Sequence, residues 1–220
     1  CQPRLVNLFK RSFPDAKIFP RKKEPEPELL SSNINYQSPS GSLLQWLLPP
    51  FKKGEISEKY LIADCAETSV FHSRYRTDGV EKLVGIGWAT SFLTDGWDNV
   101  PLETFDLLLE TPGIKFVSVQ YGDHSVELEA IFHRTGVKII EDKAVNPLEN
   151  MDRFASQLAS MDLVITLTNS TAALSCALGV PTWGISSPII DWRFGNKTNN
   201  NLWYPSLRLF RQTERANWTS

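Results

Sequence analysis

The clearest chemistry in this sequence lies in one turn of four hydroxyl and amide side chains: Thr168, Asn169, Ser170 and Thr171. The turn follows a short apolar run, 163–167, whose pattern is typical of a strand buried on both faces. Residues 172–178 are almost all small and apolar, and Gly179 predicts the end of a helix there. A helix N-terminus after a buried strand offers N–H groups and a dipole to an anion. The stretch 162–185 is therefore either an anion site or an ordinary, well-capped βαβ unit.

Other candidate binding residues follow the ends of further predicted strands. They are Gly87 and Trp88, Gln120 and Tyr121, Asp142, and the pair Asp191 and Arg193. A carboxylate such as Asp142 suits the hydroxyl groups of a ribose, and the alternative for it is a solvated strand end. Asp191 and Arg193 stand one residue apart in a loop, where binding residues collect, and a local ion pair explains them equally well.

Several other kinds of site are not predicted. The sequence has neither a G-x-G-x-x-G motif nor a lysine-containing phosphate loop, which argues against NAD and against ATP bound by a P-loop. Three scattered histidines and three cysteines at unrelated spacings indicate neither a metal site nor a disulfide framework. A net charge of −2 argues against nucleic acid as the main partner. No catalytic residue is identified.

The second part of the chain alternates regularly between strands and helices. The predicted strands are 83–88, 115–120, 137–140, 163–167 and 182–185, with 207–210 as a further candidate. The predicted helices are 102–110, 125–135, 151–160 and 172–178. This alternation predicts an α/β fold with a doubly wound parallel sheet. In the strand order 3-2-1-4-5, the ligand crevice lies between the first strand and the fourth, at their carboxyl ends.

The first 80 residues show no comparable pattern. Short helices are expected at 4–11 and 42–48, and a brief strand at 17–19. These are too few elements for a complete doubly wound domain. We therefore expect an incomplete N-terminal segment with a linker over 1–80, and a Rossmann-like domain over 81–220.

The composition agrees with a folded protein in a reducing compartment. Hydrophobic residues make up 41% of the chain, with seven Trp and twelve Phe, which is enough for a substantial core. No apolar run approaches the length of a membrane-spanning helix, and no signal peptide is recognisable. Unpaired cysteines favour the cytoplasm. The chain begins with Cys1, so we expect it to be a fragment of a longer protein.

Several segments together resemble the C-terminal half of bacterial glycosyltransferases of the GT-B fold. The segments are 84–88, 116–123, 162–166, 177–183, 191–193 and 203–211. The most similar group is related to heptosyltransferases and O-linked GlcNAc transferases and is often fused to tetratricopeptide repeats. Residues 3–6 and 11–14 also resemble part of that group's N-terminal domain.

The resemblance implies a function. The domain would hold a nucleotide-diphosphate sugar as donor substrate, without a cofactor or metal, and its sugar would pass to a glycan, lipid or protein acceptor. The turn 168–171 would meet the diphosphate, and the loop at Gln120 and Tyr121 would lie near the base. The segment 1–80 would belong to the acceptor side, and tetratricopeptide repeats would precede it in the full-length protein.

The sequence departs from the family pattern at three positions. The family usually has Asp-Thr-Ser-x-Ala-His at the turn, whereas this chain has Thr168 and Ala173 at the Asp and His positions. The residue after Trp88, often basic, is Ala89. Arg193, Arg208 or Arg211 would have to replace the lost positive charge. Two alternatives therefore stay open: a degenerate transferase-like binding module, and a sugar-nucleotide epimerase-like enzyme.

Overall fold

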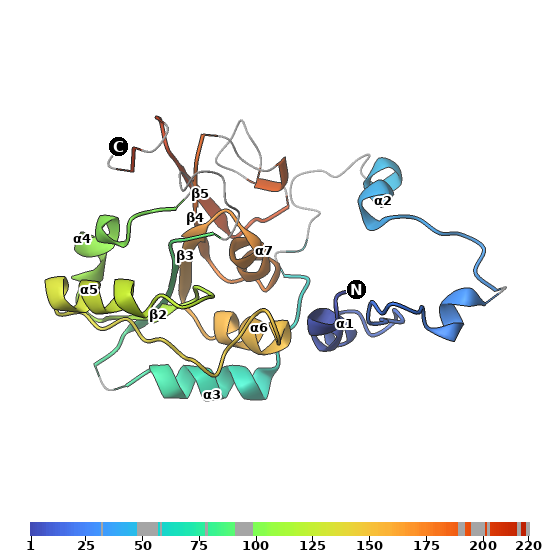
Figure 1. Cartoon of the computed structure of the whole chain (residues 1–220), viewed down its shortest axis with the longest axis horizontal. Helices are drawn as coiled ribbons and strands as arrows, with labels where there is room; N and C mark the ends of the chain where they lie inside the picture. The colour runs from blue at the N-terminus through green and yellow to red at the C-terminus, as the bar shows by residue number, and fades with distance from the viewer. Residues whose placement is uncertain are drawn as a thin grey trace.

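The computed structural model describes residues 1–31, 33–47, 57, 59–77, 79–90, 99–188, 192–194, 201, 203–214 and 217–218. At its centre lies a parallel sheet of five strands in the order β2-β1-β3-β4-β5 (Figure 1). The strands are β1 (Lys82–Gly87), β2 (Ile114–Ser118), β3 (Leu163–Leu167), β4 (Thr182–Ser186) and β5 (Leu207–Arg211). The predicted α/β fold with a parallel sheet is confirmed.

The predicted strand 137–140 is reduced to a single bridge. Ile140 exchanges backbone hydrogen bonds with β2, as its N–H donates to Phe116 and its carbonyl accepts from Ser118. This bridge lies at the position that the predicted strand order gives to the third strand. The last candidate strand is real and forms β5, which pairs with β4 along its whole length.

Helices pack on both faces of the sheet (Figure 1). One face is covered by the 3-10 turn η3 (Leu102–Phe105), α4 (Asp106–Leu109) and α5 (Ser125–Thr135). The other is covered by α3 (Cys65–Tyr75), α6 (Met151–Ala159), α7 (Ser170–Ala177) and, against α6, α1 (Val6–Ser12) with its preceding turn η1 (Pro3–Leu5). None of the helices in the described part of the chain has the length and apolar composition that crossing a bilayer requires.

Helix α3 is the main element that sequence reasoning missed. Its N-cap is Asp64, whose carboxylate accepts a hydrogen bond from the N–H of Glu67 at 2.9 Å. Phe71 and Tyr75, one turn apart, are buried in the core beneath the sheet. The pairing of Asp64 with an acidic residue three positions later is a recognisable helix start. The predicted strand at 17–19 is wrong, because these residues belong to no helix or strand of the structure.

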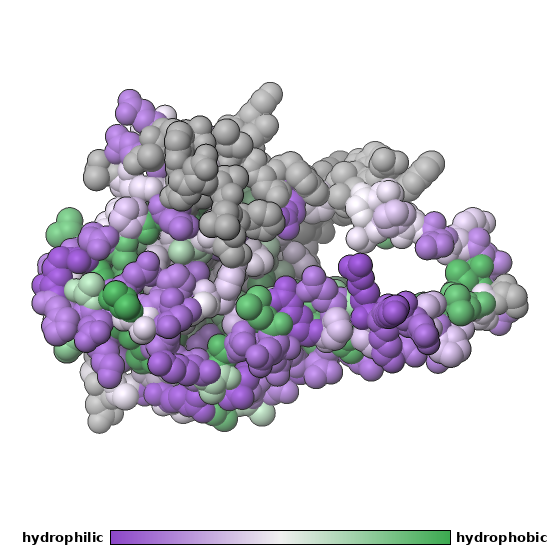
Figure 2. Space-filling model, in the orientation of Figure 1, coloured by the Kyte–Doolittle hydropathy of each residue, from purple (hydrophilic) through white to green (hydrophobic). Residues whose placement is uncertain are grey.

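The segment after α1 extends away from the sheet and carries η2 (Pro27–Leu30) and α2 (Ser40–Leu47) (Figure 1). Figure 2 shows a mostly hydrophilic surface here with one hydrophobic patch, and Leu29 and Leu30 of η2 are exposed. Near its start the chain is anchored, since Leu8 is fully buried in the same core cluster as Phe71. Residues 1–80 thus contribute to the core of the sheet domain. Their assignment to the acceptor side stays a prediction.

A buried polar network joins α3 to α6 and to the loop after Ile140. The hydroxyl of Tyr75 donates to Asp142 at 2.8 Å and accepts from the side-chain amide of Gln157 at 2.9 Å. Arg74 donates to the same carboxylate at 2.7 Å. Burial by itself raises the pKa of Asp142, but the hydrogen bonds from Tyr75 and Arg74 outweigh it, so its pKa lies below the usual value.

The close approach of β1 and β3 depends on Gly87. A Cβ atom at this position would lie 2.8 Å from Oγ1 of Thr166, its partner on β3, and ordinary contact distances separate it from its other neighbours. Gly87→Ala should therefore lower the free energy of unfolding by about 1–3 kcal/mol. In the Thr166→Ala background the same change should have a much smaller effect, as denaturant unfolding of the four variants will measure. Equal losses in both backgrounds would contradict this explanation.

The Tyr75 network gives a second prediction. Tyr75→Phe should destabilise the protein by about 1–3 kcal/mol at pH 7, because it leaves the buried side-chain amide of Gln157 without its acceptor and removes one of the donors to Asp142. Tyr36→Phe, at a side chain that is 93% exposed, should have no effect and serves as the matched control.

The loss should also depend on pH. The folded-state pKa of Asp142 is depressed, so its contribution is complete above the unfolded pKa of about 3.9 and disappears as pH falls through the folded value. The difference in the free energy of unfolding between wild type and Tyr75→Phe, measured by urea unfolding, should become smaller below about pH 4. A gap that widens in acid, or a Tyr75→Phe variant as stable as Tyr36→Phe, would refute the network's role.

Candidate functional site

The chain changes direction between β1 and β3, which are neighbours in the sheet. After β1 it continues through η3 and α4 on one face, and after β3 it continues through α7 on the other. Gly87 at the end of β1 pairs with Thr166 near the end of β3, so the two loops diverge from adjacent points. Such a reversal at the carboxyl ends of parallel strands is where open α/β sheets bind ligands.

The turn after β3 has the predicted helix cap, and the cap residue is Asn169. Its side-chain oxygen accepts from the N–H groups of Thr171 at 2.9 Å and Ala172 at 3.4 Å. Thr168 is tied to β4, because its N–H donates to the carbonyl of Ile185 at 3.0 Å. Ser170 is exposed, whereas Thr171 is buried.

Some donors at this turn have no partner. The side-chain NH2 of Asn169 makes no hydrogen bond with any residue that the structure describes, and the N–H of Ser170 has no backbone acceptor there. The side-chain oxygen of Asn169 thus accepts from two of the free N–H groups of the helix. Its own side-chain NH2 group keeps its donors available. The turn can offer an anion neutral donors and the positive end of the α7 dipole.

The loop after β1 is fastened by Gln120. The side-chain oxygen of Gln120 accepts from the N–H groups of Trp88 at 3.1 Å and Ala89 at 2.9 Å. The loop is also closed at its base, where the N–H of Val100 donates to the carbonyl of Trp88. Gln120 therefore shapes the edge beside the turn, and the carbonyl of Tyr121 accepts from its amide nitrogen at 3.4 Å.

Trp88 is an anchor within the fold, with only 2% of its surface exposed. Its indole N–H donates to Glu127 of α5 at 2.9 Å. The same carboxylate oxygen lies 2.6 Å from Nδ1 of His124, whose ring packs edge-on against Trp88. His124, to which sequence reasoning gave no role, thus helps to hold the loop; its position just before α5 was the available signal.

Asp142 is largely engaged by the network described above. Its side chain is only 9% exposed, and its second oxygen accepts from the N–H of Ala144 at 3.1 Å. The carboxylate of the neighbouring Glu141 lies 3.7 Å from Nζ of Lys143, and both of these side chains are more exposed than that of Asp142. The carboxylate of Asp142 is therefore charged and held in place, and a part in ribose binding stays a prediction.

Arg193 is exposed and lies on the 3-10 turn η4 (Trp192–Phe194). The neighbouring Phe194 is fully buried against Ala172 and Cys176, so this segment packs along α7. The carbonyl of Arg193 accepts from Asn201 at 2.8 Å. Asp191 lies outside the described residues.

A cleft of about 400 Å³ brings three of the predicted residues together: Gln120, Tyr121 and Asp142. Glu141, Lys143 and Gln157 also line it. The other described candidates do not line this cleft: Gly87, Trp88, the turn 168–171 and Arg193. In the described parts of the chain no three acidic, histidine or cysteine side chains cluster so as to hold a metal ion.

Comparisons with known proteins give the fold a context. No protein-family model matches the chain. Over 226 residues it is 26% identical to Protein FlbA of Caulobacter vibrioides, and the match covers 98% of this chain but 38% of that protein.

Two solved structures are similar at low sequence identity. A glycosyl transferase of family 9 from Veillonella parvula matches with a TM-score of 0.50 and 15% identity, over 71% of this chain and 43% of its own. The E. coli ADP-heptose lps heptosyltransferase II matches with a TM-score of 0.50 and 12% identity, over 71% and 46%. The chain thus spans less than half the length of each protein, and it has a GT-B, glycosyltransferase-like fold.

Proposed function

We propose that this chain binds the diphosphate of a nucleotide-diphosphate sugar at the 168–171 turn, and that it supplies the donor side of a sugar transfer. The observation that carries the proposal is the cap of α7. Asn169 satisfies two helix N–H groups and keeps its own NH2 free beside the N–H of Ser170. These donors stand at the carboxyl edge where the sheet order reverses.

A neutral cap suits a phosphate ligand better than a charged one. An aspartate at the same position would cap the helix equally well but would place a negative charge against the diphosphate. Asn169 instead adds a donor to the helix dipole. When the sugar leaves, negative charge grows on the diphosphate, and fixed donors of this kind stabilise it without a metal.

The nucleoside would occupy the cleft of about 400 Å³ at the carboxyl end of β2. Gln120 and Tyr121 line this cleft on the side of the β1 loop, and Asp142 lines it on the side of α3. Asp142 is ionised at neutral pH, because its pKa is lowered by its hydrogen bonds, and a carboxylate accepts well from ribose hydroxyls.

Positive charge for the diphosphate would come from Arg193. Among the alternatives, the guanidinium of Arg208 lies over the rings of Phe210 and Trp183, at 4.9 and 5.9 Å from their centroids. Those rings belong to the sheet face opposite α7, which directs Arg208 away from the turn. Arg193 follows β4 on the segment that packs against the first turn of α7.

In the transfer, an acceptor hydroxyl attacks the anomeric carbon of the sugar and the bond from that carbon to the diphosphate breaks. The hydroxyl proton passes to a base that we do not assign to this chain. The acceptor would be a glycan, a lipid or a protein, and the reaction would take place in the cytoplasm. We also propose that the full-length protein carries tetratricopeptide repeats, as the group that this sequence resembles often does.

A second candidate function is binding without transfer. Ala173 and Ala89 stand where the resembled family has a histidine and often a basic residue. A module with this turn would hold a nucleotide sugar or a glycan but would stabilise the leaving group less well. It would show donor binding with no release of nucleoside diphosphate in the presence of acceptors.

Donor binding is tested directly by saturation-transfer NMR with ADP-, UDP- and GDP-sugars at millimolar concentration. We expect contacts for at least one nucleotide sugar, and weaker contacts for the matching nucleoside, which lacks the diphosphate. The absence of contact with all three donors would refute donor binding, whether or not transfer follows it.

The cap itself gives a sharper test. Asn169→Asp should keep the stability of the protein, because both residues cap helices well, but should weaken nucleoside diphosphate binding by at least about tenfold through charge repulsion. Asn169→Ala should lose about 1 kcal/mol of stability as well as a phosphate donor. Titration calorimetry and thermal unfolding measure the two effects separately.

Asn150→Asp is the matched control. Asn150 caps α6 in the same way, with its side chain accepting from the N–H of Arg153 at 3.0 Å, and it belongs neither to the 168–171 turn nor to the lining of the cleft. This variant should bind nucleoside diphosphate as the wild type does. Equal affinity in Asn169→Asp and Asn150→Asp would contradict the assignment of the diphosphate to the α7 cap.

A further inference from the structure

The cleft at the carboxyl end of β2 contains a buried amide whose oxygen has no partner among the described residues. Gln157 of α6 lines this cleft and is only 2% exposed. Its side-chain nitrogen donates to the hydroxyl of Tyr75 at 2.9 Å, whereas its side-chain oxygen makes no hydrogen bond. The unpartnered amide of Gln212 is shielded from solvent, but the oxygen of Gln157 is not. The small exposed part of Gln157 therefore includes this oxygen, which faces the cleft.

The order of hydrogen bonds around Tyr75 determines which way this amide points. The carboxylate of Asp142 is charged and can only accept, and it lies 2.8 Å from the hydroxyl of Tyr75. The hydroxyl has a single hydrogen, which it donates to Asp142, so it must accept from Gln157. Gln157 consequently turns its NH2 group toward Tyr75 and its oxygen toward the cleft.

Apolar side chains line much of the same cleft. Phe154, one turn before Gln157 on α6, lines it together with Val119, Val145 and Leu148. Phe154 and Val119 belong to one core cluster, against which Val145 packs. A flat nucleobase suits this lining, because its faces are apolar while its edge carries hydrogen-bonding groups.

Two kinds of acceptor therefore line the cleft. The carboxylates of Glu141 and Asp142 belong to the loop after Ile140, and the neutral oxygen of Gln157 belongs to α6. The carboxylates suit the hydroxyl groups of a ribose. The oxygen of Gln157, held on the same helix as Phe154, suits an N–H donor on the edge of a base.

We propose that Gln157 is a specificity-determining residue of the donor site, whose side-chain oxygen accepts a hydrogen bond from the exocyclic amino group of the nucleobase. This inference rests on the proposed function, because it takes a nucleoside to occupy the cleft. Adenine and cytosine carry such an amino group, whereas uracil has a carbonyl oxygen at the corresponding position. Tyr75 is a positioning residue, since it holds the amide in this orientation.

Two pairs of nucleoside diphosphates test the preference. ADP is compared with purine riboside 5′-diphosphate, which lacks the 6-amino group, and CDP is compared with UDP. Titration calorimetry on the full 220-residue chain should give at least one amino-bearing ligand an affinity about tenfold above that of its partner. If neither amino-bearing ligand binds more tightly than its partner, the proposal is refuted.

Gln157→Met removes the amide and keeps an unbranched side chain of similar length. The ratio of affinities within the preferred pair should fall to about one. A partial loss of folded protein would not change this ratio, because it weakens both ligands equally. In Tyr75→Phe the oxygen remains but the amide is free to turn, so the ratio should fall part of the way. The full ratio in Gln157→Met would refute the proposal, and the full ratio in Tyr75→Phe would refute the positioning role.

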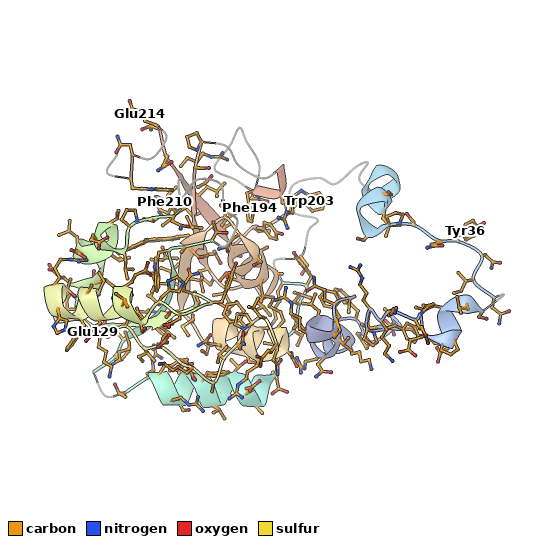
Figure 3. The ribbon with its side chains drawn as sticks, viewed as in Figure 1. Tyr36, Glu129, Phe194, Trp203, Phe210 and Glu214 are labelled. Carbon is orange, nitrogen blue, oxygen red and sulfur yellow. The ribbon has the colours of Figure 1, made fainter. Side chains whose placement is uncertain are left out.

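Gln37→Met is the matched control. Gln37 is exposed and follows Tyr36, which Figure 3 places on the segment between η2 and α2, away from the sheet. This variant should keep both the affinities and their ratio. A ratio that falls as far in Gln37→Met as in Gln157→Met would contradict the assignment to Gln157.

The same titrations separate this proposal from the proposed function. Asn169→Asp should weaken the binding of every nucleoside diphosphate but keep the ratio, because it changes the diphosphate contact and leaves the base contact intact. If none of the four ligands binds to the wild type, the proposed function itself fails. If they bind without a preference for the amino group, only the role of Gln157 fails.

Discussion

The parallel pairing of β1 with β3 is the constraint on which the rest of the structure depends. It requires Gly87, because the Thr166 side chain leaves no room for a Cβ atom there. This close contact brings two strand ends together while their connecting segments depart to opposite faces of the sheet. The loop after β1 and the turn after β3 therefore share one edge, although they are about 80 residues apart in the sequence.

Most polar groups around that edge satisfy one another. Gln120 holds the backbone of the β1 loop, and Tyr75 and Arg74 hold Asp142. The turn after β3 differs, since the amide of Asn169 and the N–H of Ser170 keep free donors among the described residues. A preorganised edge with a few unused donors is what anion binding requires, because little has to rearrange when the ligand arrives.

Periodicity in the sequence was enough to predict the sheet, its order and helix α5, which ends at Gly136 with the expected left-handed conformation. It failed where tertiary contacts determine the local structure. The segment 137–140 keeps one bridge of its predicted strand, and Asp142 meets Tyr75 from a helix that was not predicted. Local pattern likewise cannot reveal that Trp88 is buried or that Gln212 lacks partners, because both depend on distant elements.

Above all, we propose that the capped N-terminus of α7 binds a diphosphate. The most direct measurement is a crystal structure of the chain soaked with the nucleoside diphosphate that it binds most tightly. The claim predicts phosphate oxygens within hydrogen-bond distance of the side-chain nitrogen of Asn169 and the backbone nitrogen of Ser170. A diphosphate bound elsewhere on the chain, with neither contact, would contradict it.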